Sequence, residues 1–308
     1  MNLYQGLRMR AASTLDEALE FAPRKILVRV SEEQSSLAEC QEVMKNPKRK
    51  YDCKQPAGDA EFDRDAATLF NEEMPLNRLA DVALKKGLPE NMEQALAEMV
   101  WVRSVLMGDD ASAAKVLPLL PEKIRAEAGA GTDFRPTVTL VRNPGLRPYL
   151  DAGVQRSYSY DFVESYRDNW WCRKWDLNES DSYWQQRVMA RFPMTEMEPA
   201  PAFLSAEERS LAKQESAKLR GMDSADVVLG QRILTYAKAH PEDPDVPEAL
   251  FLVLRMVRYS CGTLGGPTDE ASRNEQHLEN EVREGAARIL RQRYAASPWT
   301  KKAAPFVR

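Results

Sequence analysis

Apolar residues recur at steps of three and four through most of the chain, the spacing that gathers them on one face of an α-helix. Between residues 60 and 130 this spacing predicts a run of short helices. Proline suits the first turn of a helix and glycine suits its end. The prolines that begin such segments are Pro75, Pro89 and Pro121, and the glycines that end them are Gly87, Gly108 and Gly129.

Two further helices are predicted in the same part of the chain. An earlier one has its apolar positions at Phe62, Ala66, Leu69 and Phe70. A later one runs from Ala111 to about Leu117, where Asp109 or Asp110 can accept the free amides of the first turn. The connections between all these helices are very short, so successive helices should lie antiparallel on one another.

The C-terminal part returns to the same helical pattern. Ser205 followed by Glu208 is a capping box, which opens a helix that ends near Arg220. A second helix starts at Asp223 and a third at Pro247. After a polar loop at 262–275, a last helix carries apolar residues from Val282 to Tyr294.

β-prone runs are few. Lys25–Val30 is the clearest, and Thr137–Val141 is a weaker second. Two short runs this far apart can form a small ribbon at most, or either can be an edge segment or a helix start. The predicted fold is therefore all-α: an α-solenoid of antiparallel helix pairs with a short irregular N-terminal lead-in.

Composition divides the chain into four regions. Residues 1–58 form a mixed lead-in segment, and 59–130 form an N-terminal helical section. Residues 131–201 are rich in glycine, proline and aromatic residues, which suits a junction. Residues 202–308 form a C-terminal helical section.

Composition and charge exclude several classes of protein. Apolar residues are 43% and charged residues 29% of 308, which is typical of a folded globular chain. The formal net charge is −4, so the whole chain lacks the basic balance of a protein that lives on nucleic acid, and we expect no nucleic-acid partner. No stretch approaches the roughly 20 apolar residues that cross a bilayer, so we expect no membrane span.

Residues 1–12 do not resemble a signal peptide, although the chain could be a piece of a longer secreted protein.

Four cysteines, Cys40, Cys53, Cys172 and Cys261, lack the close spacing of metal ligands, and the chain has only two histidines. We therefore expect no metal site and no cofactor. Two disulfides are favoured, because Cys40 and Cys53 bracket a polar loop and the other two cysteines each end an aromatic or apolar segment. Four reduced, buried thiols are the alternative. Disulfides would indicate an extracytoplasmic protein and reduced thiols a cytoplasmic one.

Aromatic residues crowd into residues 158–184, where Trp and Tyr side chains could stack on sugar rings or anchor a peptide. The candidate ligand-binding residues are Tyr166, Trp170, Trp171, Trp175 and Trp184. The competing interpretation is structural, with these rings filling the junction between two helical halves. Nearby carboxylates raise a glycosidase-like alternative, in which a pair would perform acid–base chemistry. They are Asp161, Glu164, Asp168, Asp176, Glu179 and Asp181.

No catalytic residues are predicted. His240 precedes a proline in a polar turn, where a helix C-cap role is expected, and His277 lies in a polar surface stretch. Neither accompanies a nucleophile elbow, and the glycines at 262–266 lack the Gly-Lys-Ser/Thr ending of a phosphate-binding loop. Arg258, on an apolar helix, is expected to pair with Asp168 or Glu248.

An internal echo links Ile233–Pro241 with Ile289–Pro298: in each, an apolar helix ends in a Tyr-Ala step and a proline that allows a new helix to begin. This pattern resembles the helix-turn-helix unit of tetratricopeptide-type arrays, especially divergent ones of bacterial envelope proteins. Tyr294–Ala303 is similar to the ending common in that group. The resemblance covers about 70 residues and lacks the full 34-residue consensus.

A second resemblance rests on Asp168–Cys172, Pro244–Leu250, Arg258–Cys261 and Tyr294–Lys302. Together these segments resemble the C-terminal region of long, uncharacterised bacterial helical-repeat proteins. The resemblance implies a Cys172–Cys261 disulfide and an envelope location, and it implies no catalytic residues.

The sequence therefore predicts a non-enzymatic protein-interaction or scaffold module of the bacterial cell envelope. A protein partner is expected, with a glycan as the second class of ligand. The alternative function is a carbohydrate-binding or carbohydrate-active protein that uses the aromatic cluster at 158–184.

Overall fold

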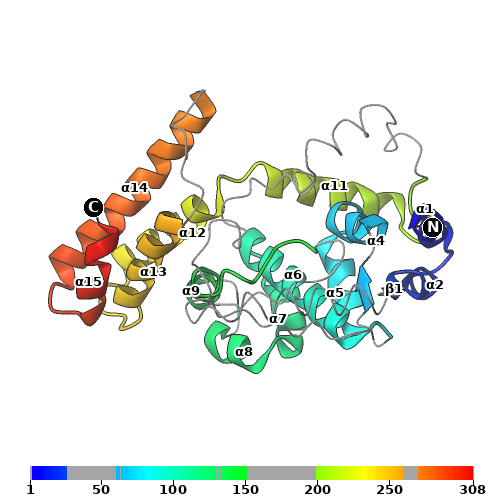
Figure 1. Cartoon of the computed structure of the whole chain (residues 1–308), viewed down its shortest axis with the longest axis horizontal. Coiled ribbons are helices and arrows are strands. Elements are labelled where there is room, and N and C mark those ends of the chain that lie inside the picture. Colours follow the sequence, from blue (N-terminus) through cyan, green and yellow to red (C-terminus); the bar gives the residue numbers. More distant parts are fainter. Residues whose placement is uncertain are drawn as a thin grey trace, which may run out of the picture.

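The computed structural model describes residues 2–25, 60–150 (without 63, 86, 130 and 132), 199–259 and 270–307. These residues are mostly helical, as the apolar spacing predicted. Figure 1 shows α1 at one end of the long axis of the molecule and α15 at the other, while α11 lies back over the N-terminal section. In the described part of the chain, no helix is long and apolar enough to span a membrane.

The N-terminal elements are α1 (Asn2–Ala11), α2 (Leu15–Glu20) and a two-stranded ribbon. Strand β1 (Pro23–Lys25) pairs antiparallel with β2 (Ala60–Phe62), with Pro23 opposite Phe62. Of the predicted strand at 25–30, Lys25 is thus confirmed as a strand residue, and 26–30 lie outside the described residues. The prediction of Phe62 as helical was wrong, because the helix starts two residues later.

The central helices lie close to their predicted positions. They are α4 (Arg64–Thr68), α5 (Leu76–Leu84), α6 (Glu90–Met107), α7 (Asp110–Val116) and α8 (Glu122–Ala128). A π-helical turn, η1 (Leu69–Glu73), follows α4 directly, and a 3-10 turn, η2 (Leu117–Leu119), follows α7.

The predicted signals at the end of α6 and the start of α7 are confirmed. Gly108 ends α6 with φ +73°, a left-handed conformation that glycine adopts without steric cost. Asp109 then caps α7, and its side chain accepts a hydrogen bond from Ser112 N.

Helix α6 is the centre of the N-terminal section. Every residue from Met99 to Leu106 is buried, including Trp101 and Arg103. A helix buried on all sides must be surrounded by other elements, and α6 contacts α5, α7, η2, α9 and β2.

Of the alternatives left open for Thr137–Val141, the strand was wrong and the helix was right, because these residues lie in helix α9 (Phe134–Arg142). Their β-branched side chains favour a strand only weakly. Phe134, Val138 and Val141, at steps of four and three, are all buried on one helical face, and this tertiary burial outweighs the local preference.

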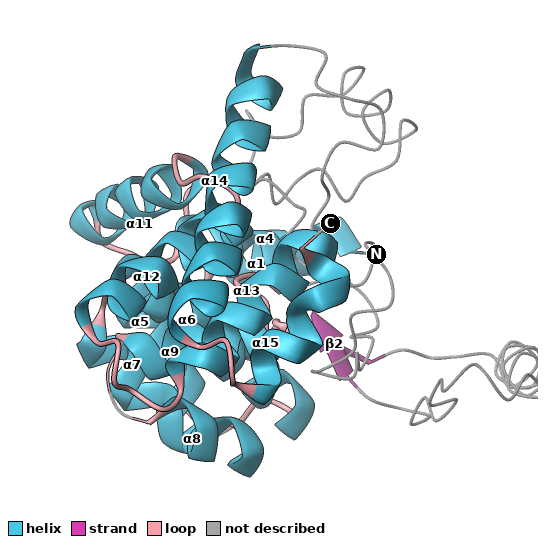
Figure 2. Ribbon diagram, turned by 90° about the vertical axis from the view of Figure 1, so that its left-hand side faces the viewer, coloured by secondary structure: helices cyan, strands magenta, loops and turns pink. Residues whose placement is uncertain are grey.

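The C-terminal section contains α11 (Ala206–Arg220), α12 (Ala225–Ala239), α13 (Val246–Tyr259), α14 (Glu270–Arg293) and α15 (Pro298–Ala303), followed by a 3-10 turn, η4 (Ala304–Phe306). The capping box of Ser205 and Glu208 is formed as predicted. Figure 2 shows α12, α13, α14 and α15 beside one another, with the N-terminal end of α14 projecting beyond the rest.

Helix α11 does not stack beside α12 in the way that α13 does. It runs back along the N-terminal section and contacts η1 (Figure 1). Helix α9 in turn contacts α12 and α13 as well as α8. Contacts therefore cross between the N-terminal and C-terminal sections at two separate places.

Two glycines allow α12 and α14 to approach closely. A Cβ atom on Gly230 of α12 would lie 2.3 Å from Val282 Cγ1, and one on Gly285 of α14 would lie 2.9 Å from Leu234 Cδ1. Neither position has room for a side chain unless the facing residue moves, so this helix contact depends on glycine from both sides.

Candidate functional site

The residues that the sequence singled out for ligand binding lie outside the described residues. These are Tyr166, Trp170, Trp171, Trp175 and Trp184, together with the nearby carboxylates at 161–181 and all four cysteines. Their roles as binding groups or disulfide partners therefore stay predictions. The described residues offer a different candidate surface and a buried network of charged groups.

The two histidines are placed as the sequence predicted. His240 is the C-cap residue of α12, and its backbone N–H donates to Tyr236 O. His277 is exposed on α14, with its Nε2 3.4 Å from Glu281 Oε1. Within the described ranges, no group of His, Cys, Asp and Glu side chains could hold a metal ion.

Arg103, on the buried helix α6, is the centre of a polar network. Its Nε donates to Pro148 O at 2.6 Å, and one terminal nitrogen lies 3.4 Å from Asn71 Oδ1. Burial lowers the pKa of Arg103 to about 10, while Glu215 and Glu72 act in the opposite direction. The guanidinium therefore stays charged at neutral pH inside the protein.

Asn71 extends this network from the π-helical turn η1 to the chain that follows α9. Its Nδ2 donates to Leu150 O at 3.0 Å, and its Oδ1 accepts from Leu150 N at 2.9 Å. The amide thus pairs with both backbone groups of one residue, as a neighbouring strand would. π-helical turns are rare and often mark functional positions. Here the turn aims Asn71 at Leu150, which lies outside the described helices and strands.

Glu215 of α11 satisfies the start of α5. Its Oε2 accepts from Leu76 N at 2.7 Å, and Pro75, before that residue, has no side chain that could cap the helix. Burial raises the pKa of Glu215, and the bond from Leu76 and the charge of Arg103 partly oppose that rise.

Arginine side chains from the C-terminal section donate hydrogen bonds to free carbonyls at the C-terminal ends of two helices. Arg232 of α12 donates to Val105 O and Leu106 O in the last turn of α6, at 2.7 and 2.5 Å. Arg255 of α13 donates to Arg142 O at the end of α9, at 3.1 Å. Cations at helix C-termini satisfy free carbonyls and complement the helix dipole. These arginines join the two sections through helix ends.

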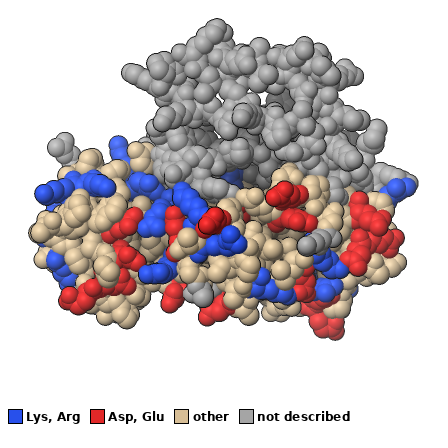
Figure 3. Space-filling view, turned by 90° about the horizontal axis from the view of Figure 1, so that it is seen from below, with Lys and Arg blue, Asp and Glu red and all other residues tan. Residues whose placement is uncertain are grey.

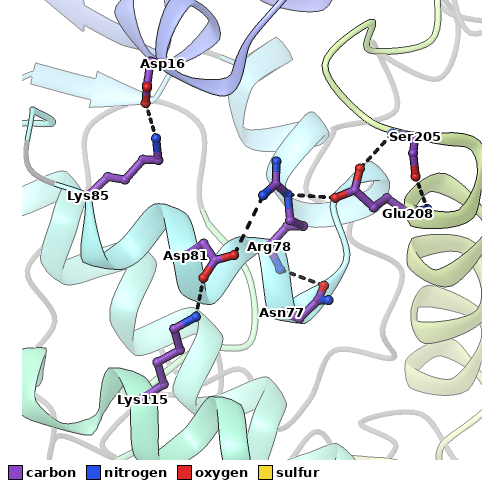
Figure 4. A network of polar contacts seen from close by, with 8 residues as sticks. All are labelled: Asp16, Asn77, Arg78, Asp81, Lys85, Lys115, Ser205 and Glu208. Carbon is purple, nitrogen blue, oxygen red and sulfur yellow. Dashed lines mark hydrogen bonds and ion pairs between the residues drawn. The ribbon is translucent and has the colours of Figure 1, made fainter.

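A second polar network lies at the surface of α5 (Figure 4). Arg78 pairs with Glu208 of α11 at 2.9 Å and approaches Asp81 at 3.9 Å. Asp81 also pairs with Lys115 of α7. Glu208 is the capping-box residue of α11, so one carboxylate both starts that helix and attaches it to α5.

The expected pairing of Arg258 with Glu248 was wrong. Glu248 pairs with Arg142 of α9 at 3.0 Å, and Arg258 is exposed at the end of α13. Position 258 lies on the solvent side of α13, whereas the apolar side is formed by residues such as Val253 and Met256. Asp168, the other expected partner, lies outside the described residues.

Partly buried aromatic residues lie together on α13, α15 and η4. The Phe251 and Trp299 rings are 5.4 Å apart and tilted by 30°, and Phe306 contacts Phe251 edge-on at 5.8 Å. Tyr259 meets Phe306 at 6.4 Å. Basic residues adjoin these rings, and Lys302 Nζ lies 4.1 Å from the Trp299 centroid. We call Phe251, Arg258, Tyr259, Trp299, Lys301, Lys302 and Phe306 together the C-terminal surface.

Local hydrogen bonds hold α15 in place. Ser297 caps α15 and accepts from Trp299 N at 3.3 Å. Thr300 Oγ1 donates back to Tyr294 O at 2.6 Å, and the Tyr294 hydroxyl donates to Pro241 O at 2.6 Å, in the turn between α12 and α13. The Tyr294–Ala303 segment therefore fixes the orientation of Trp299 and the lysines after it.

The C-terminal surface was missed by the sequence interpretation. Its aromatic residues are spread over more than 50 positions, from Phe251 to Phe306, and meet only because α13 and α15 pack together. One signal was present: residues 285–307 contain basic residues and no Asp or Glu, although the chain as a whole is acidic. On the face shown in Figure 3, several Lys and Arg side chains lie at the end of the molecule where Figure 1 places α13–α15, with Asp and Glu side chains beside them.

Carboxylates gather at the other end of α14. Glu279 lies near Asp226 of α12, which is 1% exposed, and near Glu275. Burial, and then the charges of Asp226 and Glu275, raise the pKa of Glu279 to about 7, while Arg283 acts in the opposite direction. Glu279 is therefore a group that titrates near neutral pH.

Comparison of the chain with protein-family models, with curated proteins and with solved structures finds no match in any of the three.

Proposed function

We propose that this chain is a non-enzymatic protein-interaction or scaffold module of the bacterial cell envelope, built as an α-solenoid of antiparallel helix pairs. The observation that carries the proposal is a repeated pattern of packing. Helix α13 contacts both helices of the next pair, α14 and α15, and α9 likewise contacts both α12 and α13. Stacked helix pairs that each contact the next pair are the basis of helical-repeat scaffolds.

Two tyrosines support the same interpretation. Tyr236, near the end of α12, stacks on Phe134 of α9 with the rings 3.8 Å apart. Tyr294, directly after α14, donates its hydroxyl to Pro241 O in the turn before α13. In both cases a tyrosine at the end of the first helix of a pair contacts the pair before it, as expected for related repeats.

The use of charged groups also favours a scaffold. Arg103, Glu215, Arg232 and Arg255 each bond to backbone groups at helix ends or loops. The fold therefore accounts for where these four charged side chains lie. Binding by an extended helical surface needs no reactive side chain.

Site-specific photo-crosslinking tests this proposal. A photoreactive phenylalanine analogue would replace Gln292, an exposed residue of α14, and Leu119, an exposed residue of η2, in the intact chain. We expect Gln292 to crosslink one defined protein in envelope extract and Leu119 to crosslink it less. Equal crosslinking from both positions, or turnover of a polysaccharide that depends on a carboxylate at 161–181, would contradict a scaffold with a defined binding face.

The envelope location has its own test. Mass spectrometry of the native protein after alkylation, with and without reductant, reports whether Cys40, Cys53, Cys172 and Cys261 are paired. The proposal expects all four to be oxidised, with Cys172 joined to Cys261, because disulfides persist in oxidising compartments. Four freely alkylated thiols would place the protein in a reducing compartment.

A further inference from the structure

We propose that the C-terminal surface binds an acidic polypeptide segment that also carries apolar side chains. This inference rests on the proposed function and names the chemistry of the partner. It starts from two properties that coincide on α13, α15 and η4. Aromatic rings there are only partly buried, and the basic side chains beside them form no ion pair with any carboxylate in the described part of the chain.

The apolar component comes from Phe251, Tyr259, Trp299 and Phe306. All are partly buried, and they contact one another across α13, α15 and η4. Aromatic residues in this arrangement provide a large contact area that needs little further ordering on binding. Trp and Tyr are also the residues that most often dominate the energy of protein interfaces.

The basic component is unusual for an acidic chain. Residues 249–259 and 285–307 contain no Asp or Glu, whereas the chain carries a formal net charge of −4. Arg258, Arg293, Lys301 and Lys302 are exposed. Among the described residues, none of these four has an ion-pair partner. Elsewhere Arg78, Lys85 and Lys115 each pair with a carboxylate.

The geometry favours a polypeptide over a nucleic acid. Lys302 Nζ lies over the Trp299 ring, and Phe251 packs against that same ring. The Trp299 ring thus already has two neighbours within the fold, whereas base stacking needs a free aromatic face. A long polyanion would extend over the carboxylates of the rest of the chain, whereas a short acidic segment can lie within the basic patch. The same repulsion disfavours an anionic membrane.

Fluorescence anisotropy on the full chain tests the proposal. The probe is a short labelled peptide in which Glu alternates with Leu and Phe. A matched peptide replaces every Glu with Gln, and a second replaces Leu and Phe with Ser. The protein variants are Lys301→Glu with Lys302→Glu, and Lys213→Glu as the control. Lys213 is an exposed lysine of α11 that lies outside the C-terminal surface.

We expect the Glu-containing peptide to bind, and the double Lys variant to weaken its affinity by about tenfold or more. Replacing Glu by Gln, or Leu and Phe by Ser, should weaken binding to a similar degree. Raising the salt from about 50 to about 300 mM should also weaken it, because exposed charges are screened. Lys213→Glu should change affinity by less than about twofold, since this charge is remote.

Several results would overturn the proposal. One is equal binding of the Glu and Gln peptides, and another is an equal loss with Lys213→Glu. Tighter binding of a single-stranded oligonucleotide, or of phosphatidylserine vesicles, would assign the surface to another partner class. Circular dichroism checks that each variant stays folded. If the peptide fails to bind but Gln292 still crosslinks one defined protein, this inference is wrong and the scaffold proposal stands. If the crosslink is absent as well, both proposals are wrong.

Discussion

The region around α6 and the region formed by α12–α15 are both helical, but different interactions hold them together. Around α6, a buried guanidinium and a buried amide bind the backbone of distant segments: Arg103 bonds to Pro148 O, and Asn71 bonds to both backbone groups of Leu150. In α12–α15, helices approach through glycine, as Gly230 faces Val282 and Gly285 faces Leu234.

This difference indicates which positions of each region can be substituted without loss of stability. A network of buried polar groups fixes irregular segments whose backbone would otherwise lack partners. Close helix packing fixes a regular array and leaves the outer helix surfaces free to vary. We therefore expect the α6 region to provide stability and the C-terminal region to provide binding.

Removing the guanidinium of Arg103 should have the largest effect. Arg103→Ala removes the hydrogen-bond donor to Pro148 O and one of the donors to Asn71 Oδ1, and it opens a cavity. The free energy of unfolding should therefore fall by about 3–5 kcal/mol. Urea denaturation followed by circular dichroism measures this change. Arg258→Ala is the matched control, because that arginine is exposed. If the two variants lost equal stability, Arg103 would not be a central structural group.

Adding one methyl group at Gly230 should have the next largest effect. In Gly230→Ala the new Cβ meets Val282 Cγ1 at 2.3 Å, so either the Val282 side chain must rotate or α12 and α14 must separate. We expect a loss of about 1–3 kcal/mol in the free energy of unfolding. Gly285→Ala should cost less, because the nearest atom is the flexible end of Leu234. The double variant Gly230→Ala, Val282→Ala should recover part of the loss; no recovery would contradict this contact.

Glu279 should make stability depend on pH. Its pKa is raised to about 7 in the folded protein, so folding favours the protonated carboxyl. The stabilisation is present below the unfolded pKa of about 4.3 and is lost as pH rises to about 7. Allowing for solvent screening of a partly buried group, we expect Glu279→Gln to be more stable than the unmodified protein by about 1–2 kcal/mol at pH 8.

The measurement is urea denaturation of both proteins at several pH values from 5 to 8. The difference between them should shrink as the pH falls, because the native carboxyl is then protonated too. A difference that stays constant with pH would mean that Glu279 does not titrate in this range.

Breaking a surface ion pair should have the smallest effect. Lys85 pairs with Asp16, whose side chain is 77% exposed, so the two charges are well solvated (Figure 4). We expect Lys85→Ala to change the free energy of unfolding by less than about 0.5 kcal/mol. Thermal denaturation at low and high salt checks this expectation. A loss as large as that of Gly230→Ala would show that surface pairs join these elements more strongly than we infer.

Helix positions were predictable where apolar spacing and end signals agree. Gly108 with Asp109, and Ser205 with Glu208, are local signals that act within a few residues, so they are readable from sequence. Thr137–Val141 stayed ambiguous, because its β-branched residues suggested a strand while a helix start was also open. Burial of Phe134, Val138 and Val141 on one face outweighed that preference.

The C-terminal surface could not be found from local patterns. Phe251 and Phe306 meet through the packing of α13 on α15, and no spacing rule connects positions so distant in sequence. The pairing of Glu248 with Arg142 has the same origin. The absence of acidic residues from 285 to 307 was readable, but it gains meaning only once these residues lie beside partly exposed aromatic rings.

Hydrogen–deuterium exchange of the full chain, with and without the Glu-containing peptide, tests the division between a stabilising and a binding region most directly. We predict slower exchange on peptide binding in α13 and in residues 288–307, with α5–α7 unchanged. The region around Arg103 should exchange slowly in both states, because its amides open only with the whole protein. Protection that appears in α5–α7 and is missing from α13 and α15 would contradict the account.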